Sequence, residues 1–383
     1  MKFLLGSALA ALLVVACSAP PGVAYGGRPP VPPVKTATPA GPAGPRPSPR
    51  AAPATPSLAR LIGQKLVIRM DGATPSADLL GRIRRGEIGG VILLGASITT
   101  RPALITLTRT LQAAATQGHQ PTLLIAVDQE GGAIKRIPWA PPTLSPLQLG
   151  ARKCASVSRA QGQATGAALH SLGINVDFAP VADVPASSAS FMERQGRTFS
   201  SSATETATLA DAIAGGLRSE GVVPVMKHFP GLGSATRDTD SYVVRIAASK
   251  AALAGGLRPY RTAIAHDIPM IMLSNATYSA YDVDDAAGWS HPIGVTLLRG
   301  ELGFTGVTIT DSLDGTARSR GVSERTLASR AAAAGTDLLL LTGSESTTNA
   351  TYAALLREAQ AGSLSRTMLR ASYERIRTLK ASL

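Results

Sequence analysis

Residues 222–233, VVPVMKHFPGLG, combine an apolar run, a basic pair and a tight turn. The run ends at Met226, and Lys227 and His228 follow it directly. Proline and two glycines then turn the chain, as these residues commonly do at the end of a strand. An apolar run that stops at polar side chains and a turn is typical of a buried parallel strand whose C-terminal end opens on a functional site.

Seven other short runs have the same character. They are rich in Val, Ile and Leu without strict alternation, as expected for strands that are buried on both faces. Helical segments rich in Ala, Leu and Arg, such as SATETATLADAIAGGLRSEG (202–221), separate them. The seven runs are KLVIRM (65–70), GGVILL (89–94), TLLIAVD (122–128), INVDFAPVAD (174–183), IPMIMLSN (268–275), GVTITD (306–311) and DLLLLTG (337–343).

This alternation predicts the fold class. Eight strand–helix units over about 300 residues indicate an α/β fold, a (β/α)8 TIM-type barrel that forms a single catalytic domain at residues 57–383. The main alternative is a doubly wound sheet, which has the same alternation. No GxGxxG motif follows the first run, which disfavours a dinucleotide-binding version of that sheet.

Several of the runs end in a polar residue. In a barrel these ends meet at the C-terminal face, where active sites are built. Any one of these side chains could instead cap a helix or bond to a loop, but together they favour a site. They are Asp128, Asp183, His228, Asn275 and Asp311.

The composition and net charge of the chain limit the kinds of molecule that it is expected to bind. The chain has 383 residues, 44% of them hydrophobic, and a formal net charge of +13 that comes mostly from arginine. This charge would favour anionic polymers of a cell envelope or lipid head groups. The basic residues form no dense run and do not interleave with aromatic residues, so we expect no binding to nucleic acid.

The N-terminus predicts export and anchoring. MKFLLGSALAALLVVACSAP (1–20) has a basic Lys2, an apolar run too short to span a membrane comfortably, and small residues before Cys17. This pattern resembles the lipobox of bacterial lipoproteins, in which the cysteine is acylated. We therefore expect a signal peptide at 1–17 and a lipid anchor on the extracytoplasmic face of the cell membrane. The alternative is an ordinary secretory signal with an incidental cysteine.

Residues 18–56 are rich in Pro, Ala and Gly and cannot bury a core. We expect them to form a disordered, extended tether between the anchor and the folded domain. Such a tether would hold the domain away from the membrane surface.

Four motifs, in this order and spacing, resemble glycoside hydrolase family 3, and in particular its single-domain bacterial β-N-acetylhexosaminidases. The combination is specific, although each motif alone is weak. The resemblance implies a retaining exo-glycosidase on a barrel, without metal or cofactor, that acts on carbohydrates with a terminal N-acetylglucosamine, such as peptidoglycan fragments. We expect the protein to be a monomer. The motifs are VDQEGGAIKR (127–136), RQGRTF (194–199), KHFPGLG (227–233) and GVTITDSL (306–313).

The family's functional residues match named positions here. A retaining glycosidase needs a nucleophilic carboxylate and a separate proton donor. The family's nucleophile falls on Asp311, at the end of a predicted strand, although Asp is also a common helix cap. Carboxylates accept hydrogen bonds from sugar hydroxyls, and Arg and Lys donate them. The implied sugar-binding residues are Asp128, Arg136, Arg197, Lys227 and His228.

The chain departs from the family at the proton donor. In the hexosaminidases an Asp-Ser-His segment follows the KHFPG motif, and its His is the general acid/base. Here the segment reads Asp238-Thr239-Asp240, so Asp240 stands at the His position and Asp238 is the retained partner. Three further departures lie in the motifs and at a strand end. Leu232 and Asn275 each stand where the family has His, and Ala133 replaces an Arg.

Two main interpretations and one weaker alternative follow. Asp240 could be a substitute acid/base, if burial and Asp238 raise its pKa. Alternatively, the domain is an impaired pseudoenzyme that binds amino sugars at the cell envelope, and a weaker alternative is a different exo-glycosidase specificity. Of the other histidines, His291 follows the sixth run and could approach the site. His119, His170 and His266 are predicted before a strand or on helices.

The anchor can be tested directly. Cys17→Ser removes the only acyl acceptor in the lipobox-like motif, so the variant should leave the membrane fraction or fail to mature. Fractionation of cells that express wild type and variant measures this. Unchanged membrane association in the variant would argue decisively against acylation at Cys17.

Overall fold

The eight predicted runs form eight strands of one parallel sheet. The computed structural model describes residues 56–383, and within it each strand pairs in parallel with the next. A parallel bridge between Ile309 and Leu338 joins the two edge strands, so the sheet closes. This closure confirms the predicted (β/α)8 barrel and excludes the doubly wound sheet. In sheet order the strands are β11 (Val307–Thr310), β9 (Met270–Leu273), β7 (Val223–Phe229), β6 (Val176–Asp177), β3 (Leu124–Val127), β2 (Gly90–Ile92), β1 (Leu66–Arg69) and β12 (Leu339–Leu341).

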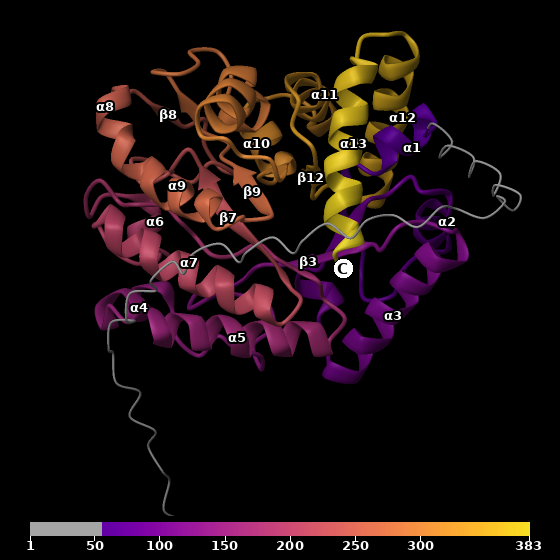
Figure 1. The fold of residues 1–383 in the computed structure, drawn as a ribbon. Helices are drawn as coiled ribbons and strands as arrows, with labels where there is room; N and C mark the ends of the chain where they lie inside the picture. The colour runs from indigo at the N-terminus through magenta and orange to yellow at the C-terminus, as the bar shows by residue number, and fades with distance from the viewer. Residues whose placement is uncertain (1–55) are drawn as a thin grey trace, which may run out of the picture. The chain divides into compact units, whose positions relative to one another are not determined.

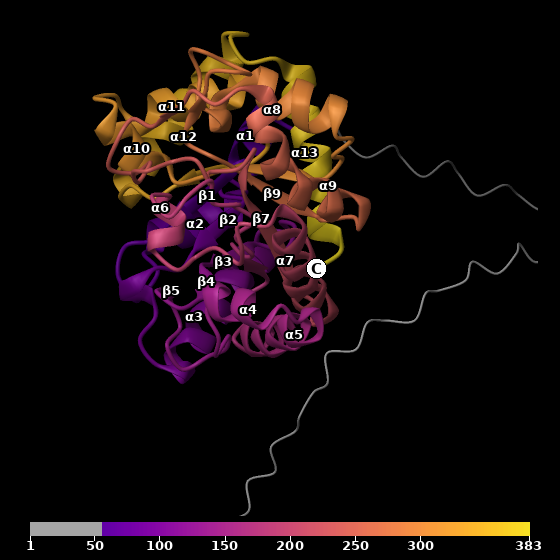
Figure 2. The same ribbon diagram turned by 90° about the vertical axis from the view of Figure 1, so that its left-hand side faces the viewer.

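Helices surround these strands, as the two views in Figures 1 and 2 show. Most begin at a serine whose side chain accepts a hydrogen bond from a backbone N–H of the first turn, for example Ser202 from Glu205 N in α7. The helices that follow or cover the strands are α1 (Leu58–Gly63), α2 (Ala77–Arg85), α3 (Arg101–Gln117), α5 (Ala155–Ser171), α7 (Ala203–Ser219), α9 (Arg258–Ala265), η4 (Pro292–Glu301), α10 (Leu313–Ser319), α11 (Glu324–Ala334), α12 (Glu345–Gln360) and α13 (Arg366–Ala381).

Short elements occupy the loops that follow the strands. An antiparallel hairpin follows β3, and a parallel pair joins the loops after β7 and β9. Because these loops leave the C-terminal ends of the strands, they enclose the face where a site is expected. They are β4 (Gln129–Gly131), β5 (Ile134–Lys135), β8 (Arg245–Ile246), β10 (Thr277–Tyr278), α4 (Pro146–Arg152), α6 (Phe191–Arg194), α8 (Lys250–Leu253), η1 (Gly95–Ser97), η2 (Ala254–Leu257) and η3 (Ala287–Trp289).

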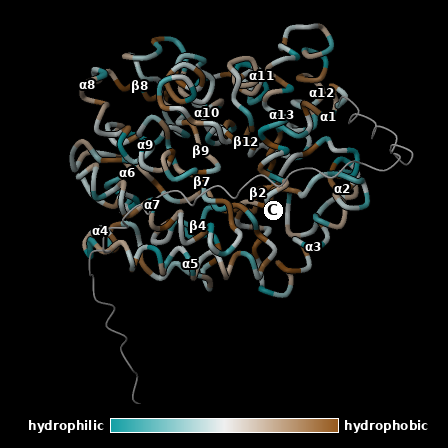
Figure 3. Tube along the Cα trace, in the orientation of Figure 1, coloured by the Kyte–Doolittle hydropathy of each residue, from teal (hydrophilic) through white to brown (hydrophobic). Residues whose placement is uncertain are grey.

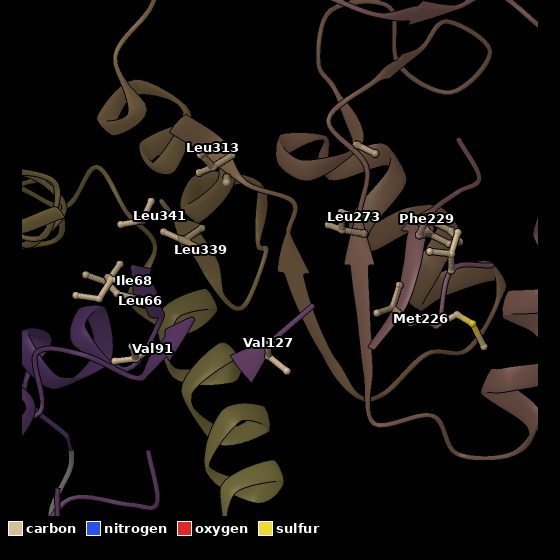
Figure 4. Close-up of a cluster of buried hydrophobic side chains, with 14 of the residues drawn as sticks. Leu66, Ile68, Val91, Val127, Met226, Phe229, Leu273, Leu313, Leu339 and Leu341 are labelled. Atoms are coloured by element: carbon tan, nitrogen blue, oxygen red, sulfur yellow. The ribbon is translucent and has the colours of Figure 1, made fainter. Parts of the chain in front are cut away.

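The strands are buried on both faces, which explains their continuous apolar sequence. In β1, Val67 belongs to the cluster inside the barrel, whereas Leu66 and Ile68 belong to the layer between barrel and helices. Figure 4 shows part of that outer layer, including Leu66, Ile68 and Phe229. Figure 3 shows hydrophobic stretches along the strands and mixed hydropathy along the surrounding helices.

The C-terminal helix α13 closes the N-terminal end of the barrel. Its Ile376 and Leu379 pack against the cluster inside the barrel. Lys380 is buried and donates to Gln64 Oε1 (2.7 Å) and to the carbonyl of Gly89 (2.6 Å), which precede β1 and β2. Burial lowers the pKa of Lys380 to about 7. The base of the barrel therefore depends on α13 for both apolar packing and hydrogen bonds.

A buried carboxylate, Asp337, ties the same helix to the barrel. It accepts two hydrogen bonds from Arg375 of α13 and others from Ser372, Arg299 and the N–H of Thr308. Burial would raise the pKa of Asp337, but the hydrogen bonds from Arg375 and the charge of Arg299 outweigh it and hold the pKa below its usual value. Asp337 therefore stays ionised between two arginines.

Residues Ser57–Leu383 form one compact unit. Cys17, the predicted signal peptide and the predicted tether up to residue 55 lie outside the described residues. Within residues 56–383, no helix combines the length and the apolar character needed to cross a bilayer.

The Asp337 cluster yields a stability prediction. Asp337→Ala leaves two arginines near the barrel base without their counter-charge, so it should lower the free energy of unfolding by about 3–5 kcal/mol. Glu374→Ala is the matched control, because Glu374 pairs with Arg377 on the exposed side of α13. It should cost less than about 1 kcal/mol. Urea unfolding of both variants measures the difference, and equal losses would contradict the assigned role of Asp337.

Candidate active site

A cavity of about 370 Å³ opens among the loops at the C-terminal ends of the strands. All eight residues singled out from the sequence for catalysis or sugar binding line it, although they come from distant parts of the chain. Ile92, Met272 and Leu340, from the strands themselves, form part of its apolar floor. The eight residues are Asp128, Arg136, Arg197, Lys227, His228, Asp238, Asp240 and Asp311.

One wall is a chain of buried ion pairs. Lys227 Nζ lies 2.9 Å from Asp128 Oδ1 and 2.6 Å from Glu130 Oε1. Arg197 forms a fork with the same Glu130, at 2.7 and 2.8 Å. Glu130 therefore fixes the two cations relative to each other. Arg136 lies farther out, with Nε 4.0 Å from Asp128 Oδ2, and its side chain is 40% exposed.

The charges in this wall stabilise one another. Burial alone would raise the pKa of Glu130, but Arg197 and Lys227 outweigh it and lower that pKa to about 2. Burial would likewise lower the pKa of Lys227, but Asp128 and Glu130 outweigh it and raise that pKa. Both groups are therefore charged across the neutral range. The wall presents fixed hydrogen-bond donors and a partly exposed carboxylate, that of Asp128, to the cavity.

A third carboxyl group, beneath this wall, is mostly protonated at pH 7. Asp177 at the end of β6 is fully buried, and its Oδ1 accepts from the N–H of Gln129. Burial raises the pKa of Asp177 to about 8, with a smaller contribution from the negative charges of Asp128 and Glu130. Its Oδ2 has no hydrogen-bond partner among the described residues. A protonated carboxyl at this place avoids adding another buried negative charge next to Glu130.

His228 is oriented by Asp183. The Nδ1 atom of His228 lies 2.7 Å from Asp183 Oδ2, and Asp183 Oδ1 accepts from the N–H groups of His228 and Leu232. Because a carboxylate only accepts, Nδ1 carries the proton and donates. Nε2 then faces the cavity, 3.9 Å from Asp311 Oδ2. Asp183 thus fixes the orientation of the His228 ring and anchors the turn that follows it.

Asp311 lies immediately after β11. Its Oδ1 accepts a hydrogen bond of 2.8 Å from the N–H of Ser312, and its other oxygen, Oδ2, is the one near His228. The N-cap residue of α10 is Ser312, so Asp311 precedes the cap position rather than filling it. The alternative role of Asp311, as the cap of the next helix, is therefore excluded. The carboxylate of Asp311 therefore points into the cavity. It lies at the end of β11, a strand that is held between its two neighbours in the sheet.

The loop after β7 brings two more carboxylates into the cavity. Asp238 organises this loop, because its carboxylate accepts from the N–H of Asp240 (3.1 Å) and from the hydroxyl of Ser241 (2.9 Å). The side chain of Asp240 is exposed to solvent in the cavity, yet the surrounding protein partly desolvates its carboxyl group. Partial burial, followed by the charges of Asp311 and Asp238, raises the pKa of Asp240 to about 7. Asp240 therefore exchanges a proton in the neutral range.

The five histidines of the chain all lie within the described residues, and His228 alone among them lines the cavity. His170 contacts the carbonyl of Glu220, and His266 pairs with Asp211. His291 is exposed at the start of η4 and is not among the lining residues. It does not fill the place of the missing family histidine. Among residues 56–383, no group of three His, Cys, Asp or Glu side chains is arranged to hold a metal ion.

Comparison with known families agrees with this arrangement. Residues 58–379 match the model of the glycosyl hydrolase family 3 N-terminal domain. The chain belongs to glycosyl hydrolase family 3. Membership of this family makes the chain a glycosidase. The barrel and the cavity described above correspond to the N-terminal domain of the family.

Several relatives carry names. The chain is 32% identical over 345 residues to an uncharacterised secreted glycosyl hydrolase of Arthroderma benhamiae, covering 87% of this chain and 96% of that one. It is 30% identical to a β-hexosaminidase of Xylella fastidiosa, covering 67% and 76%. Two solved structures are similar. A β-N-acetylhexosaminidase of Beutenbergia cavernae has 32% identity and a TM-score of 0.78, covering 86% and 99%. A family 3 β-N-acetylglucosaminidase of Paenibacillus has 28% identity and a TM-score of 0.81, covering 86% of this chain and 63% of that one.

The motifs did not reveal every residue that shapes the site. Glu130 stands inside the VDQEGG motif and Asp183 ends the fourth run, so both were visible, but their partners were not. Asp177 and Thr316 carried no signal at all. Thr316 lies in α10 and contacts Asp240, a relation that only the folded chain creates.

The raised pKa of Asp177 predicts a pH dependence of stability. The native state holds a proton on Asp177 up to about pH 8, whereas the unfolded chain loses it near pH 4, so this group makes stability fall as pH rises from 4 to 8. Asp177→Asn removes this loss and keeps the acceptor for Gln129. The variant should match wild type at pH 4 and exceed it at pH 9, by on the order of 5 kcal/mol. Urea unfolding at both pH values measures this, and a constant difference would contradict the assignment.

Proposed function

We propose that the chain is an exo-acting, retaining β-N-acetylhexosaminidase that releases terminal N-acetylglucosamine from cell-wall fragments by hydrolysis. One observation carries the proposal. Two carboxylates with different environments, Asp311 at a strand end and Asp240 with a pKa of about 7, line one cavity beside a wall of fixed donors. Two carboxylates of this kind are what retaining hydrolysis requires. The names of the relatives support the sugar class.

The wall of ion pairs would bind the terminal sugar. Asp128 has lone pairs left to accept from two neighbouring hydroxyls, and Lys227 and Arg197 donate to hydroxyl or carbonyl oxygens. Because Glu130 already fixes both cations, little side-chain freedom is lost when the sugar binds. Arg136 is the most exposed member of the set and would reach the sugar from the mouth of the cavity.

In the first chemical step, Asp311 Oδ2 would attack the anomeric carbon. The bond from that carbon to the leaving oxygen breaks, and protonated Asp240 gives its proton to that oxygen. The product is a glycosyl ester on Asp311 and a neutral leaving group. His228 Nε2 lies 3.9 Å from this attacking oxygen, so the ring borders the site of attack.

In the second step, Asp240 would act as a base. Its carboxylate takes a proton from water, and the hydroxide formed attacks the anomeric carbon and releases Asp311. An ionised Asp240 repels an anionic acceptor such as phosphate, so water is the favoured acceptor. This charge argument is the reason for proposing hydrolysis rather than phosphorolysis.

A second candidate is a pseudoenzyme that binds amino sugars without cleaving them. One observation favours it: the cavity lacks the family histidine, and its one histidine, His228, is held by Asp183. The sugar-binding wall serves both candidates equally. Cleavage of a natural disaccharide separates them.

We also propose that the enzyme works at the extracytoplasmic face of the cell membrane, attached through acylated Cys17. The signal-like N-terminus and the lipobox-like pattern before Cys17 support this location. The Pro-rich segment up to residue 56 would give the barrel reach from the membrane to cell-wall fragments.

Leaving-group dependence tests the proposed function. Asp240→Ala should lower kcat/KM for an N-acetylglucosamine disaccharide about 10²–10⁴-fold, because the leaving sugar needs a proton. A nitrophenyl glycoside departs without one, so the formation of its glycosyl-enzyme should change much less. Asp311→Asn should abolish turnover of both substrates.

The pH profile provides an independent check. Donation needs the protonated form of Asp240, so kcat/KM for the disaccharide should fall above about pH 7, by about tenfold for each pH unit. The nitrophenyl substrate should lack this decline. No turnover of any disaccharide by wild type would support the pseudoenzyme, and a full disaccharide rate in Asp240→Ala would remove Asp240 from the role.

A further inference from the structure

The loop that carries Asp240 rests on the first turns of α10. Thr316 of α10 is buried, and its hydroxyl lies 3.2 Å from the carbonyl oxygen of Thr239 and 3.4 Å from Asp240 Oδ1. A hydroxyl has one proton, so Thr316 donates to one of these two oxygens at a time. The same donor can therefore serve the loop backbone when Asp240 is protonated and the carboxylate when Asp240 is ionised.

Asn275 sets the direction of this hydroxyl. Its Nδ2 donates to Thr316 Oγ1 at 2.8 Å and to the carbonyl of Ser312 at 2.7 Å. The carbonyl of Ser312 requires a donor, which fixes the amide nitrogen on this side. Because Thr316 Oγ1 accepts from Asn275, its own proton is left for the loop. Asn275 is buried two residues after the end of β9, so it holds this orientation rigidly.

Gly315 provides the room that Asp240 occupies. A Cβ atom at position 315 would lie 2.9 Å from Asp240 Cβ and 3.2 Å from its Cγ, closer than packed carbon atoms approach. Any larger residue at position 315 would displace the carboxylate from α10. The helix and the loop are therefore matched in shape as well as in hydrogen bonding.

The charged groups that face Asp240 come from three elements. Partial burial, followed by the charges of Asp311 after β11 and Asp238 on the same loop, raises the pKa of Asp240, whereas the Thr316 hydroxyl and Arg318 of α10 act to lower it. A donor to the carboxylate favours the ionised form. Thr316 therefore opposes the two carboxylates and keeps Asp240 able to release its proton near neutral pH.

We propose that Thr316 is a positioning residue that holds Asp240 at the cavity, and that Asn275 orients the Thr316 hydroxyl for this task. The inference rests on the proposed acid/base function of Asp240. The contacts run from Ser312, beside Asp311, through Asn275 and Thr316 to Asp240. They link the strand end that carries one carboxylate to the loop that carries the other. Two of the positions that depart from the family pattern, 240 and 275, thus belong to one hydrogen-bonded unit.

The test compares Thr316→Val, which keeps the side-chain shape without the hydroxyl, with Thr316→Ser, which keeps the hydroxyl. Ser319→Ala is the matched control, because Ser319 lies on the same helix and its hydroxyl donates to the carbonyl of Thr316. Two measurements are made on each variant. One is the NMR titration of the Asp240 carboxyl, assigned by its loss in Asp240→Ala, and the other is kcat/KM for a disaccharide and for a nitrophenyl glycoside.

In Thr316→Val the titration of Asp240 should move to higher pH by about one unit, because the donor to its charged form is lost. The disaccharide rate should fall by about tenfold, part of the full effect of a general acid, while the nitrophenyl rate changes little. Thr316→Ser should restore both properties, and Ser319→Ala should behave as wild type. Thermal melting of each variant confirms that it is folded.

The outcomes separate this inference from the proposed function. An unchanged titration of Asp240 in folded Thr316→Val overturns the inference, whether or not wild type cleaves any substrate. If Asp240→Ala loses the disaccharide rate and Thr316→Val does not, the role of Asp240 stands and that of Thr316 falls. If Asp240→Ala keeps the full rate, the proposed function fails, and the titration still reports whether Thr316 contacts the carboxylate.

Discussion

Closure of the parallel sheet is the constraint on which the rest of the structure depends. The pairing of β1 with β12 joins the first and last strands of the barrel, and the bridge between Ile309 and Leu338 closes the ring. All eight C-terminal ends then face the same side, so residues from 128 to 311 meet in one cavity. An open sheet of the same strands would spread these residues along an edge. The ring also requires a filled interior and a closed base, which the apolar strand residues and α13 provide.

Buried charge is treated differently at the two ends of the barrel. At the base, Asp337 is ionised between two arginines and fastens both α13 and η4 to the barrel. At the open end, Glu130 is equally buried and ionised, but its two cations also face the cavity. The same physical device, a buried carboxylate with two cationic partners, gives rigidity in one place and a preorganised binding wall in the other. Asp177 avoids the cost of a further buried charge by staying protonated.

The replacement of a histidine by Asp240 changes how a proton carrier is tuned. An imidazole titrates near neutrality without assistance, whereas a carboxyl group needs an environment that disfavours its charge. Partial burial and the neighbouring Asp311 and Asp238 provide that environment. Thr316 and Gly315 of α10 provide contact and space for the side chain. The substitution is therefore physically consistent only together with its surroundings on a neighbouring helix.

The sequence by itself determined the strands, the barrel and the candidates for the site. Runs such as 222–226 are apolar on both faces because both faces are buried, and the polar residues at their ends mark the open side of the ring. Motif resemblance selected eight residues, and all eight line the cavity. Only the tertiary structure decided their partners and protonation. Glu130 with Arg197, Asp183 with His228, and Thr316 with Asp240 are far apart in sequence, and pKa values depend on burial and on charges that the fold brings near. Contacts between residues so far apart leave no periodic pattern in the sequence, because they form only when the ring has closed.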